Sequence, residues 1–169
     1  DYGNSLGHFE SKVITKTNDN FLSERSLSWD HNGLFEQITL TKEERHKLDN
    51  LLRAEYSEKD KIVLKDPRIC FFKDEYINSL EKLGYAVKII IPIRHPKSVV
   101  NSLLKRIKFR TQITTEIQCL NLWFNYNINA FKETTCSQFY YFIDDLVTSK
   151  QPLIDLTKFL SFEDIVHES

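Results

Sequence analysis

The sequence predicts an α/β fold in which a three-layer parallel sheet is flanked by helices. Three observations predict it. Residues 86–91 are a mostly apolar run, interrupted only by Lys88 and rich in β-branched side chains, which is typical of a strand covered on both faces. A helical pattern follows at once from Pro96, a residue favoured in the first turn of a helix. Strand-like segments at 61–64 and 138–143 alternate with further helical patterns, as parallel sheets require.

The other elements follow from apolar spacing and from capping residues. Residues 9–22 carry apolar side chains at helical spacing. Thr41 and Glu44 form a capping box that opens a second helix ending near Ser57. Three more helices are expected at 74–83, ended by Gly84, at 114–132, and at 151–160, with Pro152 in its first turn. For the helix at 114–132, the predicted inward stripe is Ile117, Leu120, Phe124 and Phe131.

Length and composition restrict the class of protein. The 169 residues are enough for a single domain over 1–169 with a real core. The near balance of 23 basic and 24 acidic side chains argues against bulk nucleic-acid binding. No apolar run reaches the ~20 residues of a membrane span, and no signal peptide is visible. Cys70, Cys119 and Cys136 form no CxxC pair, so we expect buried free thiols, a reducing, cytoplasmic location and no metal site.

Arg94 lies three residues after the apolar run, at the carboxyl end of the predicted strand. Ligands bind at this end in open α/β sheets. A guanidinium is a fork of donors suited to phosphate, and a helix N-terminus adds free N–H groups and a positive dipole end. Ser102 lies eight residues later, so its hydroxyl reaches the same anion if that anion lies along the helix flank. The alternative is an arginine at a sheet edge and a serine on a solvated face, and spacing leaves both open.

Arg94-His95-Pro96 with Ser102 resembles the 3′-phosphate-binding motif of sulfotransferases that use the donor PAPS (3′-phosphoadenosine-5′-phosphosulfate). That motif is a strand ending in arginine, often Arg-x-Pro, with a serine eight residues on. Further segments resemble bacterial-type members of the family and occur in the same order. These segments are 7–11, Asn18-Asp19, Ser28-Trp29-Asp30, 64–68, 122–127 and 142–146.

The resemblance implies a P-loop NTPase-like fold and transfer of a sulfuryl group from PAPS to a hydroxyl or amine, without a metal. Arg94, Ser102 and Arg106 would bind the donor or its product PAP (3′-phosphoadenosine-5′-phosphate). The family's first strand and its Gly/Ser/Thr-rich loop for the 5′-phosphosulfate have no counterpart, because no strand precedes residues 3–7. We expect a strand, a loop and a helix to lie upstream of Asp1; the alternative is a protein without the loop that is not a working enzyme.

Sulfuryl transfer resembles phosphoryl transfer, so it needs a base for the acceptor and cations on the transferring group. The resemblance suggests Glu10, His8, Lys65 and Asp66 as catalytic residues, with Arg68 and Trp29 as substrate contacts. Lys65 would stabilise the sulfuryl oxygens, and Glu10 or Asp66 would take the proton. Structural alternatives stay open: a Lys65–Asp66 salt bridge, and a first-turn acid favoured by the helix dipole at Glu10.

The acceptor is not named by the sequence. A small molecule or a saccharide is expected, and lipids and peptides stay open. Two other classes of protein remain as alternatives. A P-loop nucleoside kinase or other phosphotransferase would need paired arginines in a lid and Mg²⁺ ligands, and the sequence has no convincing set. A non-catalytic, sulfotransferase-like binding domain is the second alternative.

Overall fold

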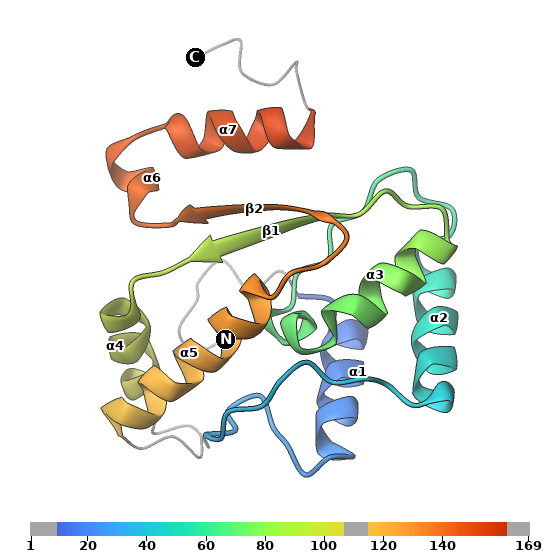
Figure 1. The fold of residues 1–169 in the computed structure, drawn as a ribbon, viewed down its shortest axis with the longest axis horizontal. Helices are drawn as coiled ribbons and strands as arrows, with labels where there is room; N and C mark the ends of the chain where they lie inside the picture. Colours follow the sequence, from blue (N-terminus) through green and yellow to red (C-terminus); the bar gives the residue numbers. More distant parts are fainter. Residues whose placement is uncertain (1–9, 107–114, 162–169) are drawn as a thin grey trace.

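Helices surround a short parallel sheet in the computed structural model, which describes residues 10–106 and 115–161 (Figure 1). The elements are α1 (Lys12–Ser23), α2 (Lys42–Tyr56), the 3₁₀ helix η1 (Pro67–Phe72), α3 (Lys73–Lys82), β1 (Lys88–Ile93), α4 (Pro96–Arg106), α5 (Glu116–Phe131), β2 (Ser137–Phe142), α6 (Asp145–Thr148) and α7 (Gln151–Leu160). The predicted mixed α/β character is confirmed. The short helix α6 was not predicted.

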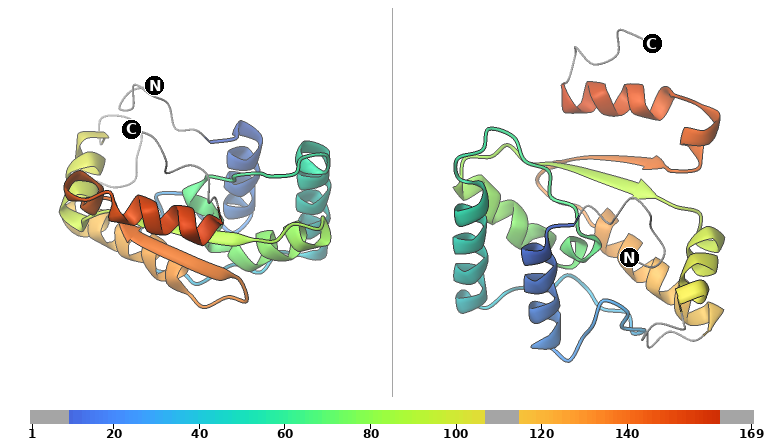
Figure 2. Two further views of the ribbon diagram at one scale, coloured as in Figure 1. Left: turned by 90° about the horizontal axis from the view of Figure 1, so that it is seen from above. Right: turned by 180° about the vertical axis from the view of Figure 1, so that it is seen from behind.

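The two strands pair in parallel, with Lys88 opposite Ser137 and Ile93 opposite Phe142. The sheet lies between α7 and the helices α1, α2 and α3 (Figures 1 and 2). The predicted strand at 61–64 is wrong, since this segment is not part of the sheet. In the described ranges the sheet therefore has two strands rather than the several that a three-layer fold implies.

The prediction that the first apolar run is covered on both faces is also wrong. Helix α5 packs against β1 on the face that holds Ile91 and Ile93, and both side chains are buried. On the opposite face α7 covers β2, where the Phe139 and Phe159 rings stack at 5.4 Å. Ile90 shares that face but remains exposed, because α7 lies over the neighbouring strand.

The main core lies where α1, α2, α3 and η1 meet. Its buried residues are Ile14, Phe21, Leu22, Leu40, Leu48, Leu52, Phe71, Phe72, Tyr76 and Leu80. A second, smaller cluster of Val100, Cys119 and Leu122 joins α4 to α5. The larger cluster anchors the helices on one side of the sheet, and the smaller one attaches α4 beside the carboxyl end of β1.

Local capping signals set several helix ends as the sequence predicts. Thr41 Oγ1 accepts from Glu44 N at 3.2 Å, and Glu44 Oε2 accepts from Thr41 N at 2.7 Å, so the capping box is confirmed. Helix α3 ends at Lys82, and Gly84 follows with φ of +89°, a left-handed conformation that favours glycine.

The three cysteines are free, but only Cys119 is buried, so the expectation of buried thiols holds for one of the three. Within the described ranges, no helix is both long enough and apolar enough to cross a membrane.

Candidate functional site

Arg94 is exposed at the carboxyl end of β1, and its main chain is fixed from two sides. The Arg94 carbonyl accepts from the indole Nε1 of Trp123, on α5, at 3.0 Å. The next residue, His95, donates its N–H to Asp144 Oδ2, just beyond β2, at 3.2 Å. Among the described arginines, three pair with carboxylates within 4.0 Å, whereas the guanidinium of Arg94 forms no such pair. The main chain of the turn is therefore held in place, and no carboxylate of residues 10–106 or 115–161 neutralises the Arg94 guanidinium.

Ser102 is half-buried on α4, the helix that starts directly after this turn. The expectation of free N–H groups at the start of α4 is wrong. Pro96 has no N–H, and the N–H groups of residues 97–99 donate to the ring nitrogen and carbonyl of His95 at 3.0–3.2 Å. An anion beside Arg94 would therefore depend on side chains. Arg106 ends α4, but its side chain lies outside the described part of the chain.

A second group of predicted residues meets in one ion network, although the network joins segments far apart in the sequence. Lys65 Nζ lies 2.6 Å from Glu10 Oε1. Arg68 Nη1 lies 2.9 Å from Asp66 Oδ1 and 3.9 Å from Glu10 Oε2, and Arg68 Nε lies 2.7 Å from Asp19 Oδ1. The proposed salt bridge between Lys65 and Asp66 is replaced by these pairings. His8, the other catalytic candidate, lies outside the described residues.

The network is buried at one end and open at the other. The Asp66 side chain is 0% exposed, and it accepts from Arg68 N at 2.9 Å and from Asn18 Nδ2 at 3.3 Å. By contrast, the side chains of Glu10 and Lys65 are 19% and 49% exposed. Asp66 is therefore a buried acceptor that holds its neighbours, while Glu10 and Lys65 face solvent and can meet a ligand.

The electrostatics keep the cation of this network charged. Burial by itself lowers the pKa of Arg68, but the charge of Asp66, the hydrogen bond that Arg68 donates to that carboxylate and the charge of Asp19 outweigh it, so the pKa is raised. Arg68 thus stays a guanidinium at every physiological pH and keeps both acids close.

Trp29, the other predicted substrate contact, is half-buried against the small cluster that joins α4 to α5. Its carbonyl accepts from the hydroxyl of Tyr126 at 2.9 Å. These contacts give Trp29 a packing role between the two helices that flank the Arg94 turn.

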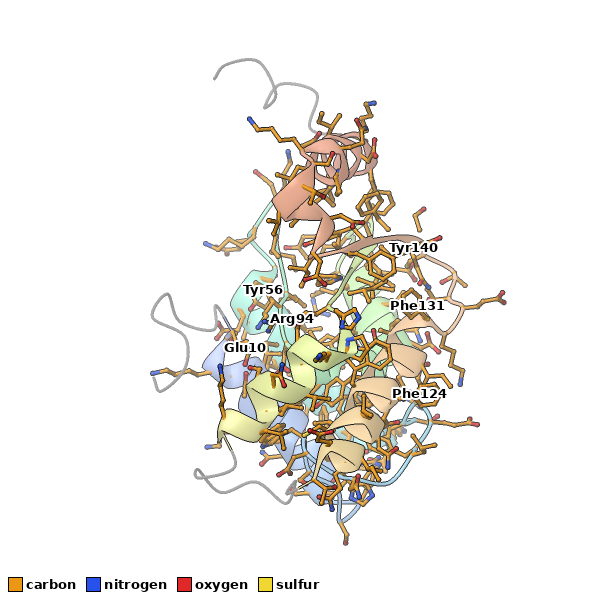
Figure 3. All side chains as sticks on the ribbon, turned by 90° about the vertical axis from the view of Figure 1, so that its left-hand side faces the viewer. Glu10, Tyr56, Arg94, Phe124, Phe131 and Tyr140 are labelled. Carbon is orange, nitrogen blue, oxygen red and sulfur yellow. The ribbon has the colours of Figure 1, made fainter. Side chains whose placement is uncertain are left out.

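An apolar groove of about 670 Å³ runs between α5 and the carboxyl ends of β1 and β2. Phe124 and Phe131 line it and are exposed, so the predicted inward stripe of α5 faces outward instead. The face of α5 that is buried holds Cys119, Leu122, Asn125 and Asn129. Figure 3 looks along the strands from their carboxyl ends and shows Phe124, Phe131 and Tyr140 on one side, with Glu10 and Arg94 toward the other.

The helix α5 has this orientation because its two buried asparagines bind a loop. Asn125 Oδ1 accepts from Phe35 N at 3.3 Å, and Asn129 Nδ2 donates to the Phe35 carbonyl at 2.9 Å. Apolar periodicity alone favours the opposite face, since it scores an asparagine as a solvent-facing residue.

Several residues that hold the site were not predicted to do so, chiefly Asn18, Tyr76, Trp123 and Asp144. A signal for Asn18 was available: it lies four residues after Ile14 and three before Phe21, on the apolar face of α1. A polar residue at such a position needs a buried partner. Trp123 and Asp144 form hydrogen bonds with main-chain groups of the Arg94 turn. Every residue has such main-chain groups, so the sequence does not indicate which of them are bonded.

No group of His, Cys, Asp or Glu in the described ranges is arranged to hold a metal ion. No protein-family model matches the chain, and comparisons with curated proteins and with solved structures found no match. The functional assignment therefore depends on the chemistry of the two groups of residues described above.

Proposed function

We propose that this protein is a PAPS-dependent sulfotransferase that transfers a sulfuryl group to a hydroxyl or amine of a small-molecule or saccharide acceptor. Its described sheet would be part of a larger, three-layer P-loop-like sheet. The free cysteines favour a reducing compartment such as the cytoplasm.

The observation that carries the proposal is the exposed guanidinium of Arg94 at the tip of a parallel strand, which pairs with no carboxylate of the described residues. Its turn is held by Trp123 and Asp144, and Ser102 lies on the helix that follows. A guanidinium binds phosphate through two parallel hydrogen bonds, and a hydroxyl on the adjoining helix would supply a third. We assign these two side chains to the 3′-phosphate of the donor.

The chemical step is assigned to the ion network. The acceptor oxygen or nitrogen attacks the sulfur, and the bond between sulfur and the 5′-phosphate oxygen breaks. PAP leaves with that electron pair, and Glu10 takes the proton of the acceptor. Lys65 and Arg68 stabilise the charge on the sulfuryl and phosphate oxygens. Glu10 is preferred to Asp66 as the base because the Asp66 carboxylate is buried and already accepts from Arg68 and Asn18.

Titration calorimetry with PAP, and separately with ATP plus Mg²⁺, tests this assignment. We expect PAP to bind at least about tenfold more tightly than ATP with Mg²⁺, a difference of about 1.4 kcal/mol. The reason is that Arg94 and Ser102 recognise a 3′-phosphate, which ATP lacks. Tighter binding of ATP with Mg²⁺ would favour a phosphotransferase. Absence of PAP binding would favour the second alternative, a non-catalytic binding domain.

A further inference from the structure

A chain of hydrogen bonds leads from the middle of the main core to the ion network. The Tyr76 hydroxyl, on α3, donates to Asn18 Oδ1, on α1, at 2.8 Å. Asn18 Nδ2 donates to Asp66 Oδ2 at 3.3 Å. Asp66 Oδ1 accepts from Arg68 Nη1 and from Arg68 N, both at 2.9 Å. The side chains of four residues, from three elements, thus form one continuous chain.

Burial falls steadily along this chain. Asn18, Tyr76 and Asp66 are buried, the Arg68 side chain is 14% exposed, and Glu10 and Lys65 lie beyond it near solvent. The hydroxyl of Tyr76, the amide of Asn18 and both carboxylate oxygens of Asp66 have hydrogen-bond partners within this chain, so these three side chains are each held in one orientation. The inner residues therefore set the orientation of the outer ones.

The direction of each bond is fixed by the chemistry of its groups. Burial raises the pKa of Tyr76, so its phenol stays protonated and acts as a donor. The Asp66 carboxylate can only accept, so the Asn18 amide turns its nitrogen to Asp66 and its oxygen to the Tyr76 hydroxyl. With one oxygen thus held by Asn18, Asp66 presents the other to Arg68. The Arg68 guanidinium in turn is aimed at Asp19 and Glu10.

We propose that Asn18 and Tyr76 are positioning residues that fix the guanidinium of Arg68, through Asp66, beside Glu10. They do not touch substrate. Their effect is to keep Arg68 and Glu10 at a constant separation, so that the donor anion meets a cation already in place. The expected effect on PAP binding rests on the proposed function. The positioning of the Arg68 guanidinium by Tyr76 and Asn18 does not, because it follows from the hydrogen bonds alone.

The test compares Tyr76→Phe, which removes only the hydroxyl at the start of the chain, with Tyr85→Phe. Tyr85 is the control because its hydroxyl also donates to protein groups, the half-buried Tyr56 carbonyl and the exposed Lys59 carbonyl, and these bonds lie outside the network. We expect Tyr76→Phe to lose more thermal stability than Tyr85→Phe, because it leaves the buried Asn18 Oδ1 without a donor, whereas the exposed Lys59 carbonyl can bond to water. Only Tyr76→Phe should weaken PAP binding, by about fivefold, because the orientation of Arg68 is relaxed.

A second readout follows Arg68 itself, without any ligand. The NMR signal of its Nε–H is expected to be visible in the wild type and in Tyr85→Phe, and broadened or lost in Tyr76→Phe. An unchanged Arg68 signal in Tyr76→Phe would overturn the inference, as would equal PAP affinities of the two variants. If the wild type does not bind PAP, the proposed function fails, and the Arg68 signal still decides whether Tyr76 positions it.

Discussion

Replacing Arg94 with alanine is expected to weaken PAP binding by roughly 100-fold, about 3 kcal/mol. The guanidinium would supply two charge-assisted hydrogen bonds to the 3′-phosphate, and no protein carboxylate neutralises it within the described ranges. Calorimetric titration of the wild type and the variant with PAP measures the loss. An unchanged affinity would remove the basis of the donor-site assignment.

The substitution can be interpreted because the fold does not depend on this side chain. The bond from Trp123 reaches the Arg94 main-chain carbonyl, which alanine retains. Arg53→Ala is the matched control, since Arg53 is an exposed arginine in the last turn of α2 and its loss removes the same charge. The control should bind PAP as the wild type does. Adding Ser102→Ala to Arg94→Ala should cost little more, because two groups that grip one phosphate are not additive.

Replacing Glu44 with alanine is expected to lower the free energy of unfolding by about 3–5 kcal/mol. The Glu44 side chain is 3% exposed, and its two oxygens accept from the guanidinium of Arg25 at 2.6 and 2.8 Å. Alanine would leave Arg25 without its partner and would also break the capping box with Thr41. Urea denaturation at pH 7 measures the loss. Glu43→Ala, which removes an exposed acid from the same helical turn, is the control and should change little.

The same ion pair predicts how stability depends on pH. The hydrogen bond from Arg25 is the largest cause that lowers the pKa of Glu44, from 4.5 to about 2. A carboxyl whose folded pKa lies below its unfolded value stabilises the fold above the unfolded value, and this contribution disappears as pH falls through the folded value. We expect the wild type to lose stability between about pH 5 and pH 2. Glu44→Gln should lose less over this window, and an equal loss in both proteins would contradict the account.

Local signals in the sequence were sufficient for most of the helices. The capping box of Thr41 and Glu44, the Pro96 start of α4 and the Gly84 stop after α3 each act within one turn, so neighbouring residues determine them. The two strands of the sheet were likewise predicted from apolar runs, with ends shifted by one or two residues.

Features that depend on distant partners were predicted poorly. Residues 61–64 have the composition of a strand, but a strand needs a neighbour with which to exchange hydrogen bonds, and within the described ranges this segment has none. The outward face of α5 depends on a loop about 90 residues earlier that occupies Asn125 and Asn129. In both cases tertiary contacts, which periodicity does not contain, decided the outcome.

In the candidate site, too, single residues could be predicted from the sequence, whereas the contacts between them could not. The sequence predicted Arg94 as a site residue from its place at a strand end, and it predicted Glu10, Lys65 and Arg68 by resemblance. It did not indicate that Asp66 is buried, nor that its carboxylate is held by Asn18. Hydrogen bonds between residues 48 positions apart are set by how α1 and η1 pack, so they become visible only in the folded chain.

The most direct measurement is a crystal structure of the protein with PAP bound. We expect 3′-phosphate oxygens within about 3 Å of both the Arg94 guanidinium and the Ser102 hydroxyl. The 5′-phosphate should point toward Lys65 and Arg68. A 3′-phosphate held at the Lys65–Arg68 network instead, or one that contacts neither Arg94 nor Ser102, would contradict this expectation.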